Sequence, residues 1–124
     1  MQIIPYQEKE HQRAIYQMMC LESDWHTYIN NFFDYKKALV ADLVFICKNN
    51  SLICGFIRIK CDFSFGYYIM DLLVHKDYRN QGVGQALINY VKNNFSSPIY
   101  ILSDVNEYYK KIGFQNIIGS VILI

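Results

Sequence analysis

The chain has 124 residues, a formal net charge of +1 at neutral pH, and 52% hydrophobic residues. This length corresponds to a single domain, residues 1–124, that can bury a core without disulfides or a metal. The nearly balanced charge, with no cluster of Lys or Arg on one predicted face, argues against a nucleic-acid partner. No apolar run approaches the roughly 20 residues of a membrane span and no secretory leader is visible, so we expect a cytoplasmic protein without a membrane partner.

The first third of the chain predicts a short strand followed by two helices. Ile3 and Ile4 indicate the strand, and residues 8–21 carry apolar side chains at helical spacing. Ser23 and Asp24 can cap the second helix, whose apolar face is dense in aromatic residues: Trp25, His26, Tyr28, Ile29, Phe32 and Phe33. Such a face most often packs in a core, but it can also form the wall of a ligand pocket.

The middle of the chain predicts strands. Residues 43–47 and 52–61 fit antiparallel neighbours joined by a polar hairpin connection, and residues 65–74 fit a third strand that is apolar on both faces. Asp71 is the only charged residue of this third strand. Two roles stay open for it: a buried carboxylate whose pKa is raised by burial, or a partner of Arg58 or Lys60 on the neighbouring strand.

The last third predicts two helices and further strands. A helix starts beside Gly82 and ends near Asn93 or Asn94, and a strand follows at residues 99–102. A short helix runs from Val105 to a left-handed cap at Gly113, and residues 114–118 and 121–124 are expected to form a final hairpin. This order predicts an α/β (α+β) fold: a mixed, mostly antiparallel central sheet flanked by helices on both faces.

The junction between the third strand and the long helix is suited to binding phosphate. Gly82 and Gly84 let a ligand approach the main chain, and the amides of the first helical turn point outward at the positive end of the helix dipole. Arg79 adds a full positive charge. The pattern is neither a Walker A loop nor a dinucleotide fingerprint, whose third glycine would replace Leu87. A purely structural glycine turn is the alternative interpretation.

Two motifs together resemble the GCN5-related N-acetyltransferases (GNAT family). Arg79-x-x-Gly82-x-Gly84, between a strand and an amphipathic helix, resembles the pyrophosphate-binding motif of that family. The segment Tyr108-Tyr109-Lys110-Lys111-Ile112-Gly113-Phe114 is similar to the aromatic-Tyr-x-Lys-x-Gly-Phe segment that ends the family's last helix. The order and separation of the motifs also match, over roughly residues 71–114.

The resemblance implies a co-substrate, acetyl-CoA, whose acetyl group passes to a primary amine by direct attack on the thioester. In the family the strand before the glycine turn carries a bulge and diverges from its neighbour, so backbone groups beside the gap would meet the pantetheine arm: Leu72, Leu73 and Val74. The pyrophosphate would lie on the turn: Arg79, Asn80, Gln81, Gly82, Val83, Gly84 and Gln85. The acceptor would be a small-molecule or peptide amine, bound by a monomer or by a homodimer formed through residues 121–124.

The resemblance also implies catalytic roles. Tyr109 would protonate the departing thiolate, although a half-buried tyrosine that only packs is the alternative. Asp71 is the leading proton acceptor, directly or through water, and Tyr68 or a chain of water molecules could replace it. The chain departs from the family at two positions, because Met70 stands where some members have Glu, and Asn106 lies too close to Tyr108 to match the usual asparagine.

A metal site and a disulfide framework are not expected. The four cysteines form no Cys-x-x-Cys pair, and their apolar surroundings predict buried, reduced thiols: Cys20, Cys47, Cys54 and Cys61. A second function remains open beside the enzyme, namely a non-catalytic acetyl-CoA-binding module that docks on a protein partner.

Overall fold

The computed structural model describes residues 1–96 and 98–124 and contains a five-stranded sheet in the order β1-β2-β3-β4-β5. The strands are β1 (Gln2–Pro5), β2 (Leu43–Asn49), β3 (Leu52–Cys61), β4 (Tyr67–Val74) and β5 (Ile99–Ile101). The first four pair antiparallel, and β5 pairs parallel to β4. The prediction of a mixed, mostly antiparallel sheet is therefore confirmed.

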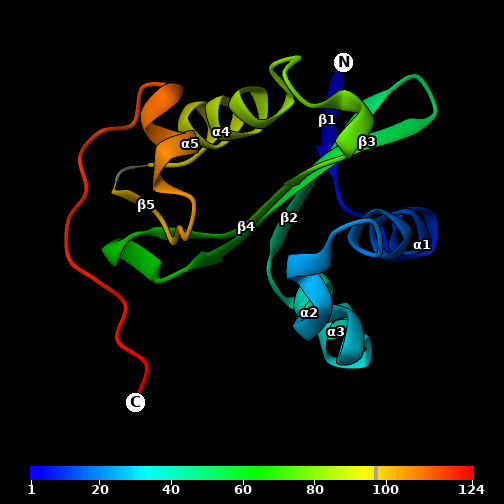
Figure 1. Ribbon diagram of the computed structural model, residues 1–124, viewed down its shortest axis with the longest axis horizontal. Coiled ribbons are helices and arrows are strands. Elements are labelled where there is room, and N and C mark those ends of the chain that lie inside the picture. The colour runs from blue at the N-terminus through cyan, green and yellow to red at the C-terminus, as the bar shows by residue number, and fades with distance from the viewer. Residues whose placement is uncertain (97) are drawn as a thin grey trace.

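Helices cover both faces of this sheet, as predicted (Figure 1). One face is covered by α1 (Glu8–Met19), α2 (His26–Asn30) and α3 (Phe32–Ala41), and the other by α4 (Val83–Asn94) and α5 (Asn106–Lys111). Short 3-10 turns precede α2, β4 and α4: η1 (Ser23–Trp25), η2 (Phe63–Phe65) and η3 (Lys76–Tyr78). The expected second helix is divided at Asn31, whose backbone leaves the helical region and whose side chain binds the Thr27 carbonyl at 2.8 Å.

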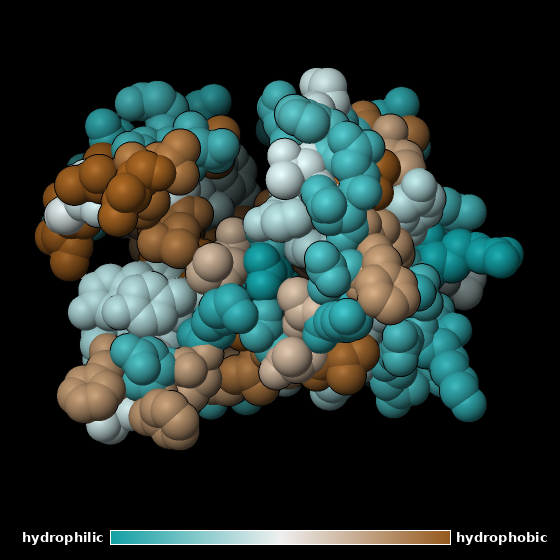
Figure 2. Space-filling view, turned by 90° about the horizontal axis from the view of Figure 1, so that it is seen from below, coloured by the Kyte–Doolittle hydropathy of each residue, from teal (hydrophilic) through white to brown (hydrophobic). Residues whose placement is uncertain are grey.

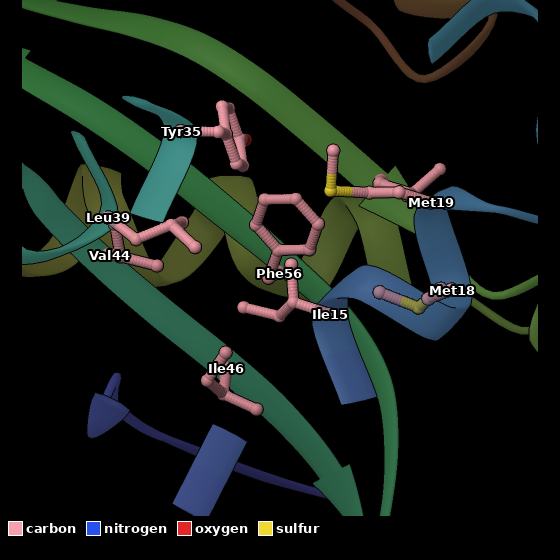
Figure 3. Close-up of a cluster of buried hydrophobic side chains, with 9 residues drawn as sticks. Ile15, Met18, Met19, Tyr35, Leu39, Val44, Ile46 and Phe56 are labelled. Carbon is pink, nitrogen blue, oxygen red and sulfur yellow. The ribbon is translucent and has the colours of Figure 1, made fainter. Parts of the chain in front are cut away.

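Each face of the sheet has its own core. Figure 3 shows side chains of α1 and α3 packed together with side chains of β2 and β3: Ile15, Met18, Met19, Tyr35 and Leu39 from the helices, and Val44, Ile46 and Phe56 from the strands. On the opposite face, α4 packs on the sheet through Val83, Leu87, Ile88 and Val91. The helices α1 and α4 thus bury the apolar faces that their 3.6-residue periodicity predicts.

The pairing of β4 is interrupted at Met70. Arg58 pairs with Asp71 and Ile59 with Ile69, so Met70 is the extra residue of a β-bulge. β4 pairs with β5 only from Tyr67 to Ile69, and the Leu102 amide then donates to the Ile69 carbonyl at 3.1 Å. From Met70 onward, β4 pairs only with β3 among the described residues, so its edge toward β5 has no strand partner and is called the free edge below. The bulge implied by the resemblance is therefore present, and the pairing of β4 with β5 ends just before it.

The predicted C-terminal hairpin is wrong. Residues 114–124 form neither helix nor strand, and apolar side chains there are largely exposed: Ile117, Ile118, Val121, Ile122, Leu123 and Ile124. Figure 2 shows a group of strongly apolar side chains exposed at one corner of the molecule. High β-propensity does not form a strand here because a short hairpin needs an apolar face to cover, and within this segment Phe114 packs against the core on the α4 face whereas the apolar side chains from Ile117 onward are exposed.

Two smaller expectations also need correction. Residues 63–65 turn as η2 instead of opening β4, with Phe63 at a positive φ of 49°. All four cysteines are free, but only Cys47 and Cys54 are buried, since Cys20 and Cys61 lie at exposed positions after α1 and at the end of β3. Among the described residues, no helix has the length and apolarity needed to cross a membrane.

Candidate active site

The glycine turn joins the free edge of β4 to the N-terminus of α4. After His75 the chain makes the η3 turn, and Asn80 and Gly82 then take left-handed conformations with φ of 63° and 81°. Gly82 ends the turn, and its carbonyl accepts the Ala86 amide at 2.9 Å as the first bond of α4. The amides of the first turn of α4 have no acceptor within the helix, as at any helix start, so they can bind an anion.

The two glycines of the motif are required for different reasons. A side chain at Gly82 would meet no atom within 4 Å, so glycine is favoured there by its positive φ alone. A side chain at Gly84 would collide with the hydroxyl of Tyr108 from α5. From the sequence, both glycines were explained by ligand approach and by turn conformation; the second reason is confirmed at Gly82, whereas the packing of the two motifs at Gly84 was missed.

Arg79 already has a partner on the opposite side of the sheet. Its Nη2 forms an ion pair with Glu22, just before η1, and its Nε lies 3.4 Å from the Val74 carbonyl. The Arg79 side chain is 46% exposed, so donors remain free toward solvent beside the turn. Sequence reasoning missed Glu22, because the two residues are separated by 57 positions.

Asp71 lies in a buried polar network on the face of α2 and α3. Its Oδ2 accepts Arg58 Nε at 2.5 Å and the Tyr35 hydroxyl at 2.8 Å, and its Oδ1 accepts the Tyr28 hydroxyl at 3.0 Å. The Asp71 side chain is 5% exposed. The expected pairing with Arg58 is confirmed, and the two tyrosines were missed because they lie on helices distant in sequence.

The network continues from Arg58 to a second carboxylate. Arg58 Nη1 binds Asp42 Oδ2 at 2.7 Å, and Lys60 binds the other oxygen of Asp42 at 3.0 Å. The alternative pairing of Asp71 with Lys60 is therefore wrong. The Lys60 side chain is 52% exposed, so the buried part of the network holds two carboxylates against one guanidinium. Burial lowers the pKa of Arg58, but the carboxylates outweigh this effect and raise it above its ordinary value.

Tyr109 lies on α5 and packs against the core on the α4 face. Burial raises its pKa to about 12, and the neighbouring Tyr108, Asp104 and Asp71 contribute in the same direction. The phenol is therefore protonated at all physiological pH values.

The other residues considered from the sequence lie outside this arrangement. Tyr68 precedes the bulge and stacks on Tyr100, with ring centroids 5.0 Å apart. His75 accepts the Asp77 amide at 3.1 Å and so caps η3. The described residues contain no group of three His, Cys, Asp or Glu side chains placed to hold a metal.

A bulged strand with a free edge, leading into a glycine turn at a helix N-terminus, defines this chain as an acyltransferase-like domain. The profile of the Acetyltransferase (GNAT) domain matches residues 41–116, and the chain belongs to this family. That match includes the bulge, the free edge of β4, the turn and both motifs.

Individual relatives agree with the family. The chain is 30% identical over 71 residues to the uncharacterized N-acetyltransferase ycf52 of Pyropia yezoensis; the match covers 52% of this chain but only 41% of that protein. The structure of the ribosomal-protein-alanine N-acetyltransferase of Brucella melitensis biovar Abortus 2308 has a TM-score of 0.75, with 14% identity over 99% of this chain and 98% of that chain. The aminoglycoside acetyltransferase AAC(6')-Iy, bound to a CoA-containing bisubstrate analogue, also has a TM-score of 0.75, with 16% identity over 99% and 96%. The two structures support the fold alone.

Proposed function

We propose that this chain transfers the acetyl group of acetyl-CoA to a primary amine. The observation that carries the proposal is the continuous path from the bulge at Met70, along the free edge of β4, to the outward amides of α4. An arm containing amide groups can pair with the free edge as an added strand would. Its pyrophosphate would then meet the helix N-terminus and Arg79.

The coenzyme would use the residues expected from the sequence. Leu72, Leu73 and Val74 would bind the pantetheine arm through their backbone, and residues 79–85 would bind the pyrophosphate through amides and Arg79. Backbone amides beside the bulge would stabilise the oxyanion that forms on the thioester carbonyl. AAC(6')-Iy, which shares the fold, was solved with a bisubstrate analogue that contains CoA, and this supports CoA as the ligand of such a fold.

The chemistry needs one proton acceptor and one proton donor. A carbon–nitrogen bond forms, the carbon–sulfur bond breaks, and the nitrogen loses a proton while the thiolate gains one. Tyr109 would protonate the thiolate; its raised pKa keeps the proton on the phenol until the thiolate appears and also makes the phenol a weaker acid than an ordinary tyrosine. Asp71 would act on the amine side through a hydroxyl or a water molecule, because both of its oxygens already accept hydrogen bonds.

Calorimetric titration tests the coenzyme site. We expect acetyl-CoA to bind the wild-type protein with a micromolar Kd, and ATP to bind at least tenfold more weakly because it lacks the pantetheine arm. Arg79→Ala combined with Gly82→Asp should abolish acetyl-CoA binding by removing one positive charge and adding one negative charge at the turn. Absence of acetyl-CoA binding to the folded wild-type protein would contradict the proposal.

The exposed apolar side chains favour a second candidate function. Apolar side chains are strongly exposed in residues 117–124 and at Phe63 and Phe65, and such exposure favours a docking surface. A non-catalytic acetyl-CoA sensor that docks on a protein would bind the coenzyme without releasing CoA. Amine-dependent release of the CoA thiol, lost in Tyr109→Phe while coenzyme affinity is kept, would exclude the sensor.

A further inference from the structure

We propose that the hydroxyl oxygen of Tyr28 binds the ammonium group of the acceptor, which makes Tyr28 a specificity-determining residue for cationic primary amines. The inference rests on the proposed acetyl transfer. It assigns the amine side of the site, to which neither motif extends.

Asp71 is poorly placed to contact an acceptor itself. Its carboxylate accepts three hydrogen bonds, from Arg58, Tyr35 and Tyr28, and its side chain is 5% exposed. Any group that arrives from outside meets one of these three donors first. Arg58 is cationic and 6% exposed, and Tyr35 is 3% exposed, so neither can receive an ammonium group.

Tyr28 is more exposed than Tyr35, and its hydroxyl oxygen can accept a further hydrogen bond from a group in solvent. Its side chain is only partly buried, whereas Tyr35 lies within the core formed by α1, α3 and the sheet. Burial first and the nearby Asp71 second raise the pKa of Tyr28 against the opposing effect of the Arg58 guanidinium, so the phenol keeps its proton and donates it to Asp71 Oδ1. The phenolic oxygen then retains lone pairs, which accept hydrogen bonds but offer nothing to an anion.

The charge behind Tyr28 favours a cation. The buried part of the network contains two carboxylates, Asp42 and Asp71, and one guanidinium, Arg58. Lys60 compensates this charge only at the Asp42 end, where it is half exposed. The Tyr28 hydroxyl lies at the Asp71 end, where the charge of Arg58 is shared between both carboxylates and the guanidinium lies 5.9 Å from the centre of the Tyr28 ring, so a positive group bound there would add to a compensation that one guanidinium alone provides in the buried part of the network.

Aromatic rings beside Tyr28 define the rest of the acceptor class. The ring of Trp25 lies 5.6 Å from that of Tyr28, and both side chains are partly exposed. An aromatic ring attracts a nearby ammonium through its face and covers an apolar carbon skeleton. The expected acceptor is therefore an organic primary ammonium compound with an apolar or aromatic body, in contrast to an acidic compound.

The position of Tyr28 also suits the reaction. Asp71 directly follows the bulge residue Met70, where β4 loses β5 and where the thioester is proposed to lie. Tyr28 is one hydrogen bond from Asp71 and approaches from the α2 side. An amine held by Tyr28 would thus reach the thioester from one face of the sheet, while Tyr109 serves the sulfur from the other.

Trp25 is the only tryptophan of the chain, so its fluorescence reports binding next to Tyr28 without any turnover. We would titrate the full chain with 2-phenylethylamine and with its uncharged analogue 2-phenylethanol. The amine should change the fluorescence in a saturable way and bind at least tenfold more tightly than the alcohol. Equal binding of both compounds, or no saturable change with either, would overturn the proposal.

Variants locate the contact. Tyr28→Phe should weaken amine binding by about tenfold to a hundredfold, the loss expected for one hydrogen bond to a charged group. Tyr16→Phe is the matched control, because Tyr16 belongs to the same aromatic region, where it packs on Phe32, but lies outside the network; it should leave the affinity unchanged. Tyr35→Phe should lower the melting temperature clearly, whereas its effect on amine affinity should be small. Equal amine affinities of wild type and folded Tyr28→Phe would disprove the assignment.

Titration of acetyl-CoA into the same variants separates the two proposals. Tyr28→Phe should bind acetyl-CoA within twofold of the wild type, since Tyr28 lies on the amine side. Failure of acetyl-CoA binding in the wild type would refute the coenzyme site, whereas a preference for the amine that Tyr28→Phe retains in full would refute only the role of Tyr28.

Discussion

The two sides of the proposed site differ in the groups that form them: backbone on the coenzyme side and side chains on the amine side. The coenzyme side consists mainly of backbone from one continuous segment, residues 70–85, with its free strand edge and helix N-terminus. The amine side consists of side chains from α2, α3, β3 and β4 that meet around Asp71. Backbone sites depend on local conformation, whereas the amine side exists only after the sheet and helices have packed. Substitutions should therefore affect the two sides in distinguishable ways.

The largest effect is expected at Tyr109, the proposed proton donor. Tyr109→Phe removes the proton donor for the thiolate and should lower kcat by about a hundredfold or more, as general-acid loss does. The Kd for acetyl-CoA should change little, because the ring is kept. Steady-state kinetics and calorimetry measure the two quantities. An unchanged kcat would remove Tyr109 from the mechanism.

The pH dependence sharpens the role of Tyr109. Because burial first, and nearby Tyr108 and acidic groups second, raise its pKa to about 12, its donor form persists as pH rises through the physiological range. The kcat profile of the wild type should therefore show no falling limb attributable to this phenol between about pH 7 and 10. A falling limb in that range that disappears in Tyr109→Phe would contradict the assignment.

The next largest effect should be on stability, from the amine side. Arg58→Met leaves two buried carboxylates without their shared cation and should lower the free energy of unfolding by about 3–5 kcal/mol. Lys60→Met is the control, because its half-exposed pair should contribute less than about 1 kcal/mol. Urea denaturation gives both values. Equal losses in the two variants would show that the network is not a buried structural unit.

A smaller effect tests the packing of the two motifs. Gly84→Ala places a methyl group against the Tyr108 hydroxyl and should cost about 1–3 kcal/mol. Adding Tyr108→Phe removes the obstructing oxygen and should recover most of that loss, a coupling that a double-mutant cycle measures. Additive losses would mean that the hydroxyl is not the obstacle.

The smallest expected effect concerns conformation alone. Gly82→Ala meets no neighbouring atom but forces a side chain into a φ of 81°, at a cost of about 1–2 kcal/mol. Gly82→Asn should cost less, since asparagine tolerates this region, as Asn80 does nearby. Thermal unfolding compares the variants. A larger loss for Asn than for Ala would indicate a steric constraint in place of a conformational one.

The sequence was most informative where structure is local. Hydrophobic periodicity predicted the strands and the long helices, and the glycine turn was recognisable because all of its elements lie within a few residues. The hairpin predicted at residues 114–124 failed, because propensity alone cannot supply the apolar face that a strand pair needs.

On the amine side, sequence patterns identified single residues but could not predict most of their contacts. Asp71 was identified as the one charge on an apolar strand, and Arg58 was one of its two proposed partners. Tyr28 and Tyr35 lie 43 and 36 positions away from Asp71 in the sequence. The pairing of Lys60 with Asp42 depends on the register of β2 and β3. Such contacts are set by tertiary packing and by the bulge at Met70, for which the sequence carries no local signal.

The central claim is acetyl transfer from acetyl-CoA to an amine, and the most direct measurement detects the product. The wild-type protein, acetyl-CoA and 2-phenylethylamine would be incubated together, and mass spectrometry would follow the acetylated amine while a thiol reagent follows free CoA. The account predicts that both products appear in equal amounts and that Tyr109→Phe forms them at least about a hundredfold more slowly. Release of CoA without an acetylated amine, or no release from a protein that binds acetyl-CoA, would contradict it.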